Sequence, residues 1–358
     1  MFNMKLKPIG LSRCNILVMF LAQFSMYFLE GFVLTLLTFT LKNQYQVDNI
    51  ASVSGDIAVY CEILGIVLDM SIGFIFDIVG RRVPLAVGYL LTAIGLVMLP
   101  FFNKVYPWFL MSRLLIAVSQ ITGNCPFVPD YIQEESQALA NGYFLMIVSF
   151  ANILSSTVLL KVSENMDPNQ IYKGTALFIT TVSALIFFKM KDVIKNDKKR
   201  EQHSPSLILK QVKDLIKEEP FICLGIWGDV CTRVIAICCT NYTTYAVNDA
   251  FNSQGRPDDD KKDYLALIFL VSNISAFFIS YLIGSVYKYF KVTSLILTSS
   301  TVMMVSAVFM VYDLDNISWI FTMAYCVVGC MNTSNFVLTQ TMVHGVLKKE
   351  SRASVLSI

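Results

Sequence analysis

Two residues of opposite charge, Glu30 and Arg113, lie inside long apolar stretches in the first half of the chain. Charged side chains are unfavourable in hydrocarbon, so those found there usually have a function. A carboxylate that is withdrawn from water and separated from a cation binds a proton more readily. The two residues could therefore take part in proton-coupled chemistry, in which protonation of Glu30 releases Arg113. A static ion pair that fixes the packing of two helices is the alternative interpretation.

A second pair, Asp229 and Arg233, is four residues apart with the acid first, which is the favourable order for an ion pair along one helix. This pair could bind a charged group of a solute, or the two charges could neutralise each other. Further polar side chains within apolar stretches could form hydrogen bonds with a polar solute, or could join neighbouring helices instead. They are Gln120, Asn124, Asn332, Asn335 and Gln340.

Patterns typical of enzymes, metal sites and nucleic-acid binding are missing from the sequence. The two histidines, His203 and His344, have no suitable partners near them in the sequence, and none of the nine cysteines forms a CxxC pair or a Cys/His cluster. The formal net charge of +2 gives no indication of a nucleic-acid partner. We therefore predict no catalytic residue, no metal and no cofactor.

The elements that position these residues follow from the composition. Hydrophobic residues make up 55% of the 358 residues and the mean hydropathy is +0.59, which is too apolar for a soluble domain of this size. About 20 apolar residues in a helix span the hydrocarbon of a bilayer, and backbone groups in lipid require such internal hydrogen bonding. Ten runs have this character: 14–41, 57–76, 83–102, 106–128, 138–160, 171–188, 221–247, 264–287, 292–312 and 317–343. They predict an all-α, polytopic transmembrane bundle.

The longest polar stretch, Lys189 to Glu219, separates six of these runs from the other four. We predict an N-terminal six-helix bundle over residues 1–190, a cytoplasmic linker over 191–219 and an incomplete second bundle over 220–358. Lysine and arginine are enriched in the cytoplasmic loops of membrane proteins. Most of these residues fall on one side of the membrane if the N-terminus is cytoplasmic, so we expect that orientation.

The short loop between the second and third runs reads Gly73-Phe-Ile-Phe-Asp77-Ile-Val-Gly80-Arg81-Arg82. Gly73 lets its helix approach a neighbour closely, and Gly80 permits a tight turn. Asp77 can cap a helix N-terminus or hold a basic partner. Arg81 and Arg82 can anchor the loop at the anionic inner surface of the membrane. The segment resembles the G-x-x-x-D-x-x-G-R-R signature of the major facilitator superfamily, which lies at the same place between spans.

A second segment follows the fourth run and reads Pro129-Asp-Tyr131-Ile-Gln-Glu134, followed by Asn141-Gly142. It resembles the P-x-Y-x-x-E…R-G pattern of the sugar-porter and organic-ion-transporter branches, with Asn141 in place of the usual arginine. Near the end of the chain, Glu350-Ser351 resembles Glu135-Ser136, which precede the fifth run. This register indicates a C-terminally truncated chain that stops at the start of an eleventh span.

The resemblance implies the major-facilitator fold, with about ten complete spans of an expected twelve, and a secondary active transporter of a small organic solute that works by alternating access. Glu30 and Arg113 resemble the acid–arginine pair of proton-coupled sugar porters, so H+ is an expected second partner. Residues 228–233 lack the paired glutamines of the sugar porters, which favours a charged or zwitterionic solute over a hexose.

A non-transporting sensor, or a degenerate relative on the same scaffold, is the alternative function. The expected partners are a small-molecule solute, protons and the lipid bilayer, without nucleic acid. We expect the protein to be a monomer.

Overall fold

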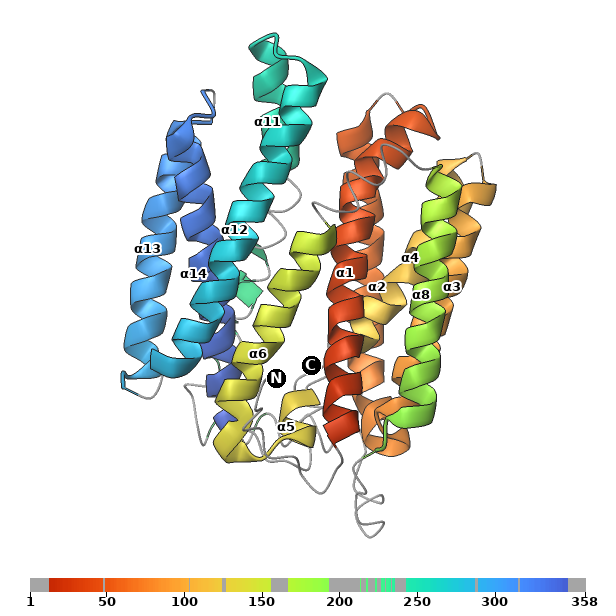
Figure 1. The fold of residues 1–358 in the computed structure, drawn as a ribbon, viewed down its shortest axis with the longest axis vertical. Helices are drawn as coiled ribbons and strands as arrows, with labels where there is room; N and C mark the ends of the chain where they lie inside the picture. The colour runs from red at the N-terminus through yellow and green to blue at the C-terminus, as the bar shows by residue number, and fades with distance from the viewer. Residues whose placement is uncertain are drawn as a thin grey trace. The chain divides into compact units, whose positions relative to one another are not determined.

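The computed structural model describes residues 13–47, 49–102, 104–123, 127–155, 167–192, 243–286, 289–314 and 316–346, with single positions between 213 and 235. The regular structure of these residues is helical, and no strand occurs among them (Figure 1). The longer helices are α1 (Arg13–Asn43), α2 (Ile50–Val79), α3 (Arg82–Met98), α4 (Leu110–Gly123), α6 (Glu134–Ile153), α8 (Pro168–Lys189), α11 (Thr243–Ser253), α12 (Asp258–Val286), α13 (Val292–Tyr312) and α14 (Trp319–Val346). Short elements are η1 (Leu99–Phe101), η2 (Val105–Phe109) and α5 (Phe127–Tyr131).

Six of the described helices are long and apolar enough to cross a membrane. Their apolar windows cover Cys14–Val33, Arg82–Phe101, Asn169–Lys189, Asp263–Ile283, Val292–Tyr312 and Trp319–Thr339. Windows of 20 or 21 residues correspond to about 30 Å of helix, the thickness of a bilayer's hydrocarbon. The prediction of an all-α transmembrane bundle is therefore confirmed. The seventh predicted run, 221–247, lies mostly outside the described residues, so the count of ten spans stays a prediction.

The chain forms two compact units, and the first contains α1 to α5 and α8. Within it, α3 packs against both α4 and α8. Small residues allow this close approach, because a Cβ atom added at Gly95 would lie only 2.8 Å from the backbone oxygen of Ser112 in α4. On the other side, the hydroxyl of Ser183 in α8 donates to the carbonyl of Ala86 in α3 at 2.7 Å. The core of this unit thus combines close helix contacts with hydrogen bonds between helices.

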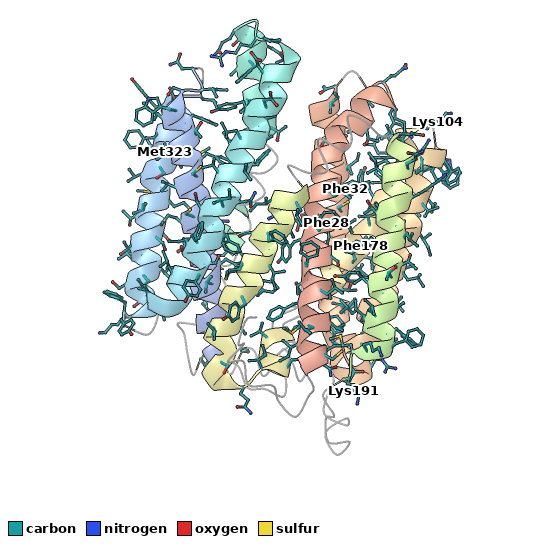
Figure 2. The ribbon with its side chains drawn as sticks, in the orientation of Figure 1. Phe28, Phe32, Lys104, Phe178, Lys191 and Met323 are labelled. Carbon is teal, nitrogen blue, oxygen red and sulfur yellow. The ribbon has the colours of Figure 1, made fainter. Side chains whose placement is uncertain are left out.

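The two ends of the first unit are closed by different contacts. At one end, which we call the Arg81 end, α1 begins, α2 ends, α3 begins and α8 ends. The backbone N–H of Lys191, just after α8, donates there to the side chain of Asn15 in α1 at 2.6 Å. At the opposite end, the hydroxyl of Tyr45 donates to the carbonyl of Leu99 at 3.2 Å. Figure 2 shows Lys191 and Lys104 at these opposite ends.

The second unit contains α6 and α11 to α14, and α14 packs against both α12 and α13. Its apolar core includes the buried side chains of Phe251, Ile268 and Phe321. A Cβ atom at Gly142 of α6 would contact the backbone oxygen of Ser280 in α12 at 3.5 Å. The predicted linker beyond residue 192 lies largely outside the described residues, so the predicted domain division remains a prediction.

Candidate transport site

Arg113 lies in α4, and only 7% of its surface is exposed. Cys61 of α2, Tyr172 of α8 and Glu30 of α1 lie close enough to its guanidinium for the ionised form of each to attract it. Four helices of the first unit therefore converge on one buried cation. We call these four residues, Glu30, Cys61, Arg113 and Tyr172, the Arg113 cluster. The structure brings Glu30 and Arg113 into the same neighbourhood, as their sequence positions predicted, and adds Cys61 and Tyr172 to them.

The Nε atom of Arg113 is buried and has no hydrogen-bond partner among the described residues. A buried cation is unfavourable unless it is both neutralised and hydrogen-bonded. The attraction of Glu30 helps to neutralise the cation. The Nε–H group, in contrast, has no hydrogen-bond acceptor among the described residues. A negatively charged hydrogen-bond acceptor brought to this atom would therefore be strongly stabilised.

Tyr172 is held beside Arg113 by contacts with α1. Its hydroxyl oxygen lies 2.6 Å from that of Thr40, and its ring packs edge-on against Phe32 with the ring centroids 5.9 Å apart. Only 3% of Tyr172 is exposed. Sequence reasoning missed Tyr172 and Cys61, because a single tyrosine or cysteine in an apolar run is also typical of ordinary helix packing.

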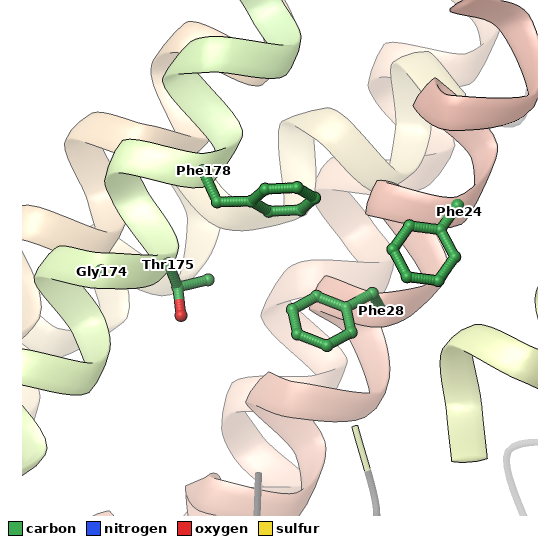
Figure 3. Close-up of a pocket in the computed structure, with 5 residues that line it drawn as sticks. All are labelled: Phe24, Phe28, Gly174, Thr175 and Phe178. Atoms are coloured by element: carbon green, nitrogen blue, oxygen red, sulfur yellow. The ribbon is translucent and has the colours of Figure 1, made fainter. Parts of the chain in front are cut away.

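A mostly apolar hollow of about 320 Å³ lies between α1 and α8 (Figure 3). Its lining residues are Phe24, Phe28, Gly174, Thr175 and Phe178. The rings of Phe28 and Phe178 meet edge to face with centroids 6.0 Å apart, and Figure 2 shows both rings in the space between the two helices. Glu30 is two residues from Phe28, about 200° around the helix axis. The hollow is therefore lined by a different face of α1 from the one that carries Glu30.

The signature residues lie at the Arg81 end. Gly73 is buried in α2, and Gly80 forms the turn between α2 and α3 with a positive φ of 98°. The guanidinium of Arg81 stacks on Phe76 at 5.0 Å from the ring centroid, and only 5% of Arg81 is exposed. The guanidinium of Arg82 stacks on Phe187 of α8 at 5.1 Å. Both arginines therefore pack against the protein itself.

Two of the predicted polar residues of the second unit can be placed. Asn335 of α14 is 3% exposed and hydrogen-bonds to Ser299 and Ser300 of α13, with its amide nitrogen donating to the Ser300 hydroxyl at 3.1 Å. This geometry agrees with helix–helix bonding, the alternative role considered for Asn335. The amide oxygen of Asn332 is buried without a hydrogen bond to any described residue. Asn332 is therefore the better candidate of the two for a solute contact.

The structure does not place the remaining candidate residues in the Arg113 cluster. Gln120 is half-buried in α4, and Gly142 is buried in α6. Asn124, Asp229 and Arg233 lie outside the described residues, as do the side chains of Asp77, Glu134 and Gln340. Their proposed roles rest on the sequence alone.

The chain matches one protein family by sequence and several solved structures by fold. The Major Facilitator Superfamily profile matches residues 19–358. Among solved structures, the xylose transporter XylE from E. coli aligns with a TM-score of 0.66 and 11% identity over 96% of this chain and 89% of that chain. The human organic anion transporter MFSD10 (TETRAN) aligns with a TM-score of 0.57 and 14% identity over 96% and 92%. A variant of the E. coli fucose:proton symporter FucP aligns with a TM-score of 0.59 and 14% identity over 96% of each chain.

Identities this low show a shared fold and carry no information on the solute. Among curated proteins, none matches the sequence at a significant level. The profile match and the apolar helices together indicate an integral, multi-pass membrane protein.

Proposed function

The chain belongs to the Major Facilitator Superfamily, and we propose that it is a secondary active transporter that moves a small organic solute across a membrane by alternating access. Members of this family are transporters rather than enzymes. We place part of the solute site at the Arg113 cluster, because four helices bring a buried cation and a carboxylate together there. The Arg81 end faces the cytoplasm in this proposal, and the transporter acts as a monomer.

The solute carries a negatively charged group, such as a carboxylate. The observation that supports this choice is the buried Nε atom of Arg113, which has no acceptor among the described residues. An anion bound there would supply both the missing hydrogen bond and a second negative charge. A neutral sugar would supply the hydrogen bond alone.

Glu30 couples solute binding to protons. While it is ionised, Glu30 attracts Arg113 and competes with an anionic solute for the same guanidinium. Protonation removes that competition, so binding of a proton and binding of the anion favour each other. A transporter with this linkage moves the proton and the anion in the same direction.

Uptake into proteoliposomes tests the solute class. Candidate solutes are radiolabelled mono- and dicarboxylates and amino acids, with xylose and fucose as neutral comparisons. Arg113→Gln should reduce anion uptake about 10- to 100-fold, the range expected for one charge-assisted hydrogen bond. Arg113→Lys keeps the charge but lacks the Nε–H group and the guanidinium fork, so it should remain impaired.

Lys173→Gln is the matched control, because it removes an exposed cation from α8 next to Tyr172. This variant should transport like the wild type. Uptake of neutral sugars with full activity in Arg113→Gln would contradict the proposed solute class. Absence of uptake of every solute by well-folded protein would favour the non-transporting alternative.

A further inference from the structure

The segment directly after α8, which we call the exit of α8, binds the start of α3 through a single carboxylate. Asp192 lies three residues beyond the end of α8, and its Oδ1 atom accepts the backbone N–H groups of Arg81 at 2.7 Å and Arg82 at 2.9 Å. The first N–H groups of a helix have no partner within the helix. No side chain at the start of α3 caps it, since Arg81 occupies the cap position without a capping hydrogen bond. Asp192 therefore serves as the cap from more than a hundred residues away.

Gly80 lies directly against the same carboxylate. A Cβ atom at Gly80 would lie 2.7 Å from Cγ of Asp192 and 2.8 and 2.9 Å from its two carboxylate oxygens. The residue also has a φ of +98°, a conformation that favours glycine. The carboxylate thus occupies the space that any other residue at position 80 would need. The glycine of the signature is required both by the turn and by the carboxylate that rests on it.

The neighbouring residue joins a third helix to the same point. The backbone N–H of Lys191 donates to Oδ1 of Asn15 at 2.6 Å, and Asn15 is buried in the first turns of α1. Arg82 also contacts α8, since its guanidinium stacks on Phe187. Lys191 and Asp192, the second and third residues after α8, therefore bind the ends of α1, α2 and α3 at the Arg81 end.

We propose that Asp192 is a positioning residue for the signature turn. Its carboxylate holds residues 80–82 in the observed conformation, so the turn and the exit of α8 move as one body. The polar stretch that leads to the second half of the chain begins at this exit. This inference does not depend on the identity of the solute or on coupling to protons.

Hydrogen exchange on the full chain in lipid nanodiscs tests the cap directly. In Asp192→Ala, the amides of Arg81 and Arg82 should exchange about tenfold faster, the change that corresponds to one such hydrogen bond. Asp192→Asn retains an oxygen acceptor and should restore most of the protection. Asp167→Ala is the matched control, because Asp167 caps the other end of the same helix by accepting the N–H of Asn169 at 3.1 Å. Unchanged exchange of the two amides in Asp192→Ala would overturn the proposal.

A double-mutant cycle with Gly80→Ala tests the same contact through stability. The added methyl group collides with the Asp192 carboxylate only when that carboxylate is present, whereas the strain of the positive φ remains in both backgrounds. Gly80→Ala should therefore lower the melting temperature more in the wild type than in Asp192→Ala. Asp192→Ser removes the carboxylate as well and serves the same cycle if Asp192→Ala does not fold. Equal shifts in both backgrounds would place Asp192 away from Gly80 and refute the proposal.

Discussion

The hydroxyl groups of Tyr172 in α8 and Thr40 in α1 are 2.6 Å apart in a buried environment. This hydrogen bond joins helices that are 132 residues apart in sequence and fixes the phenol that lies beside Arg113. In lipid or protein interior, water cannot replace the lost partner of either hydroxyl. The bond therefore sets the position of one member of the Arg113 cluster.

Tyr172→Phe should destabilise the protein by about 0.6 kcal/mol, the average measured for hydrogen bonds between transmembrane helices, and by no more than about 1.7 kcal/mol, the largest such value. Thr40→Val should have a similar effect, and the double variant should be little worse than either single variant. Unfolding in mixed micelles measures all three. Strictly additive losses would show that the two hydroxyls do not interact.

Gly95→Ala should destabilise the contact between α3 and α4. The new Cβ atom would lie 2.8 Å from the backbone oxygen of Ser112, which cannot move without displacing the helix. Overpacking of this kind typically costs about 1–3 kcal/mol. Gly174→Ala is the control, because a Cβ atom there meets no atom within 4 Å. Thermal unfolding of the two variants should separate them, and equal melting temperatures would contradict the described packing.

Asp313 should make the stability of the second unit depend on pH, with lower stability in acid. It lies in the turn between α13 and α14, and its Oδ2 accepts the backbone N–H groups of Ser318 at 2.9 Å and Phe321 at 3.0 Å. Hydrogen bonds, first from the Ser318 hydroxyl and then from these amides, hold the pKa of the carboxyl below its ordinary value. A lowered folded pKa means that the stabilisation is present above the unfolded pKa of about 3.9 and is lost as the pH falls through the folded pKa.

The difference in melting temperature between the wild type and Asp313→Asn should therefore be largest near pH 6 and shrink towards pH 3. Asp260→Asn, at the exposed start of α12, controls for the loss of a charge alone. A difference that stays constant over this range would show that Asp313 does not cap α14.

The orientation of the first unit can be tested at its two ends. With the nine native cysteines replaced by serine, Lys104→Cys should react with a membrane-impermeant maleimide in intact cells. Lys191→Cys, at the Arg81 end, should react only after permeabilisation, because basic loops favour the cytoplasm. The reverse pattern would invert the proposed topology.

The membrane helices could be predicted well because long apolar runs have few alternatives to a helix in lipid. Their ends were less predictable, since hydropathy detects only the apolar part of a helix and misses polar turns beyond it. The eighth predicted run starts at residue 264, whereas α12 begins at Asp258 and includes a charged first turn. Likewise α2 begins at Ile50, where the side chain of Asn49 accepts the N–H of Ser52, seven residues before the predicted start.

The candidate site was only partly predictable. Glu30 and Arg113 were identified because an ionisable residue is rare within an apolar run. Tyr172 and Asp192 were missed, since their roles depend on contacts across 132 and 110 or more residues of sequence, which no local pattern reveals. The charge of Asp192 is unremarkable next to a polar stretch, and its significance appears only in its contact with the signature turn.

Proton-driven accumulation by Glu30→Gln tests the central claim most directly. Proteoliposomes contain the wild type or the variant, and two rates are measured with an anionic solute found in the uptake screen. One is solute exchange without a pH gradient, and the other is accumulation driven by an inward proton gradient. We predict that Glu30→Gln retains exchange through Arg113 but loses gradient-driven accumulation. Accumulation by this variant at the wild-type rate would contradict the proposed coupling of Glu30 to Arg113.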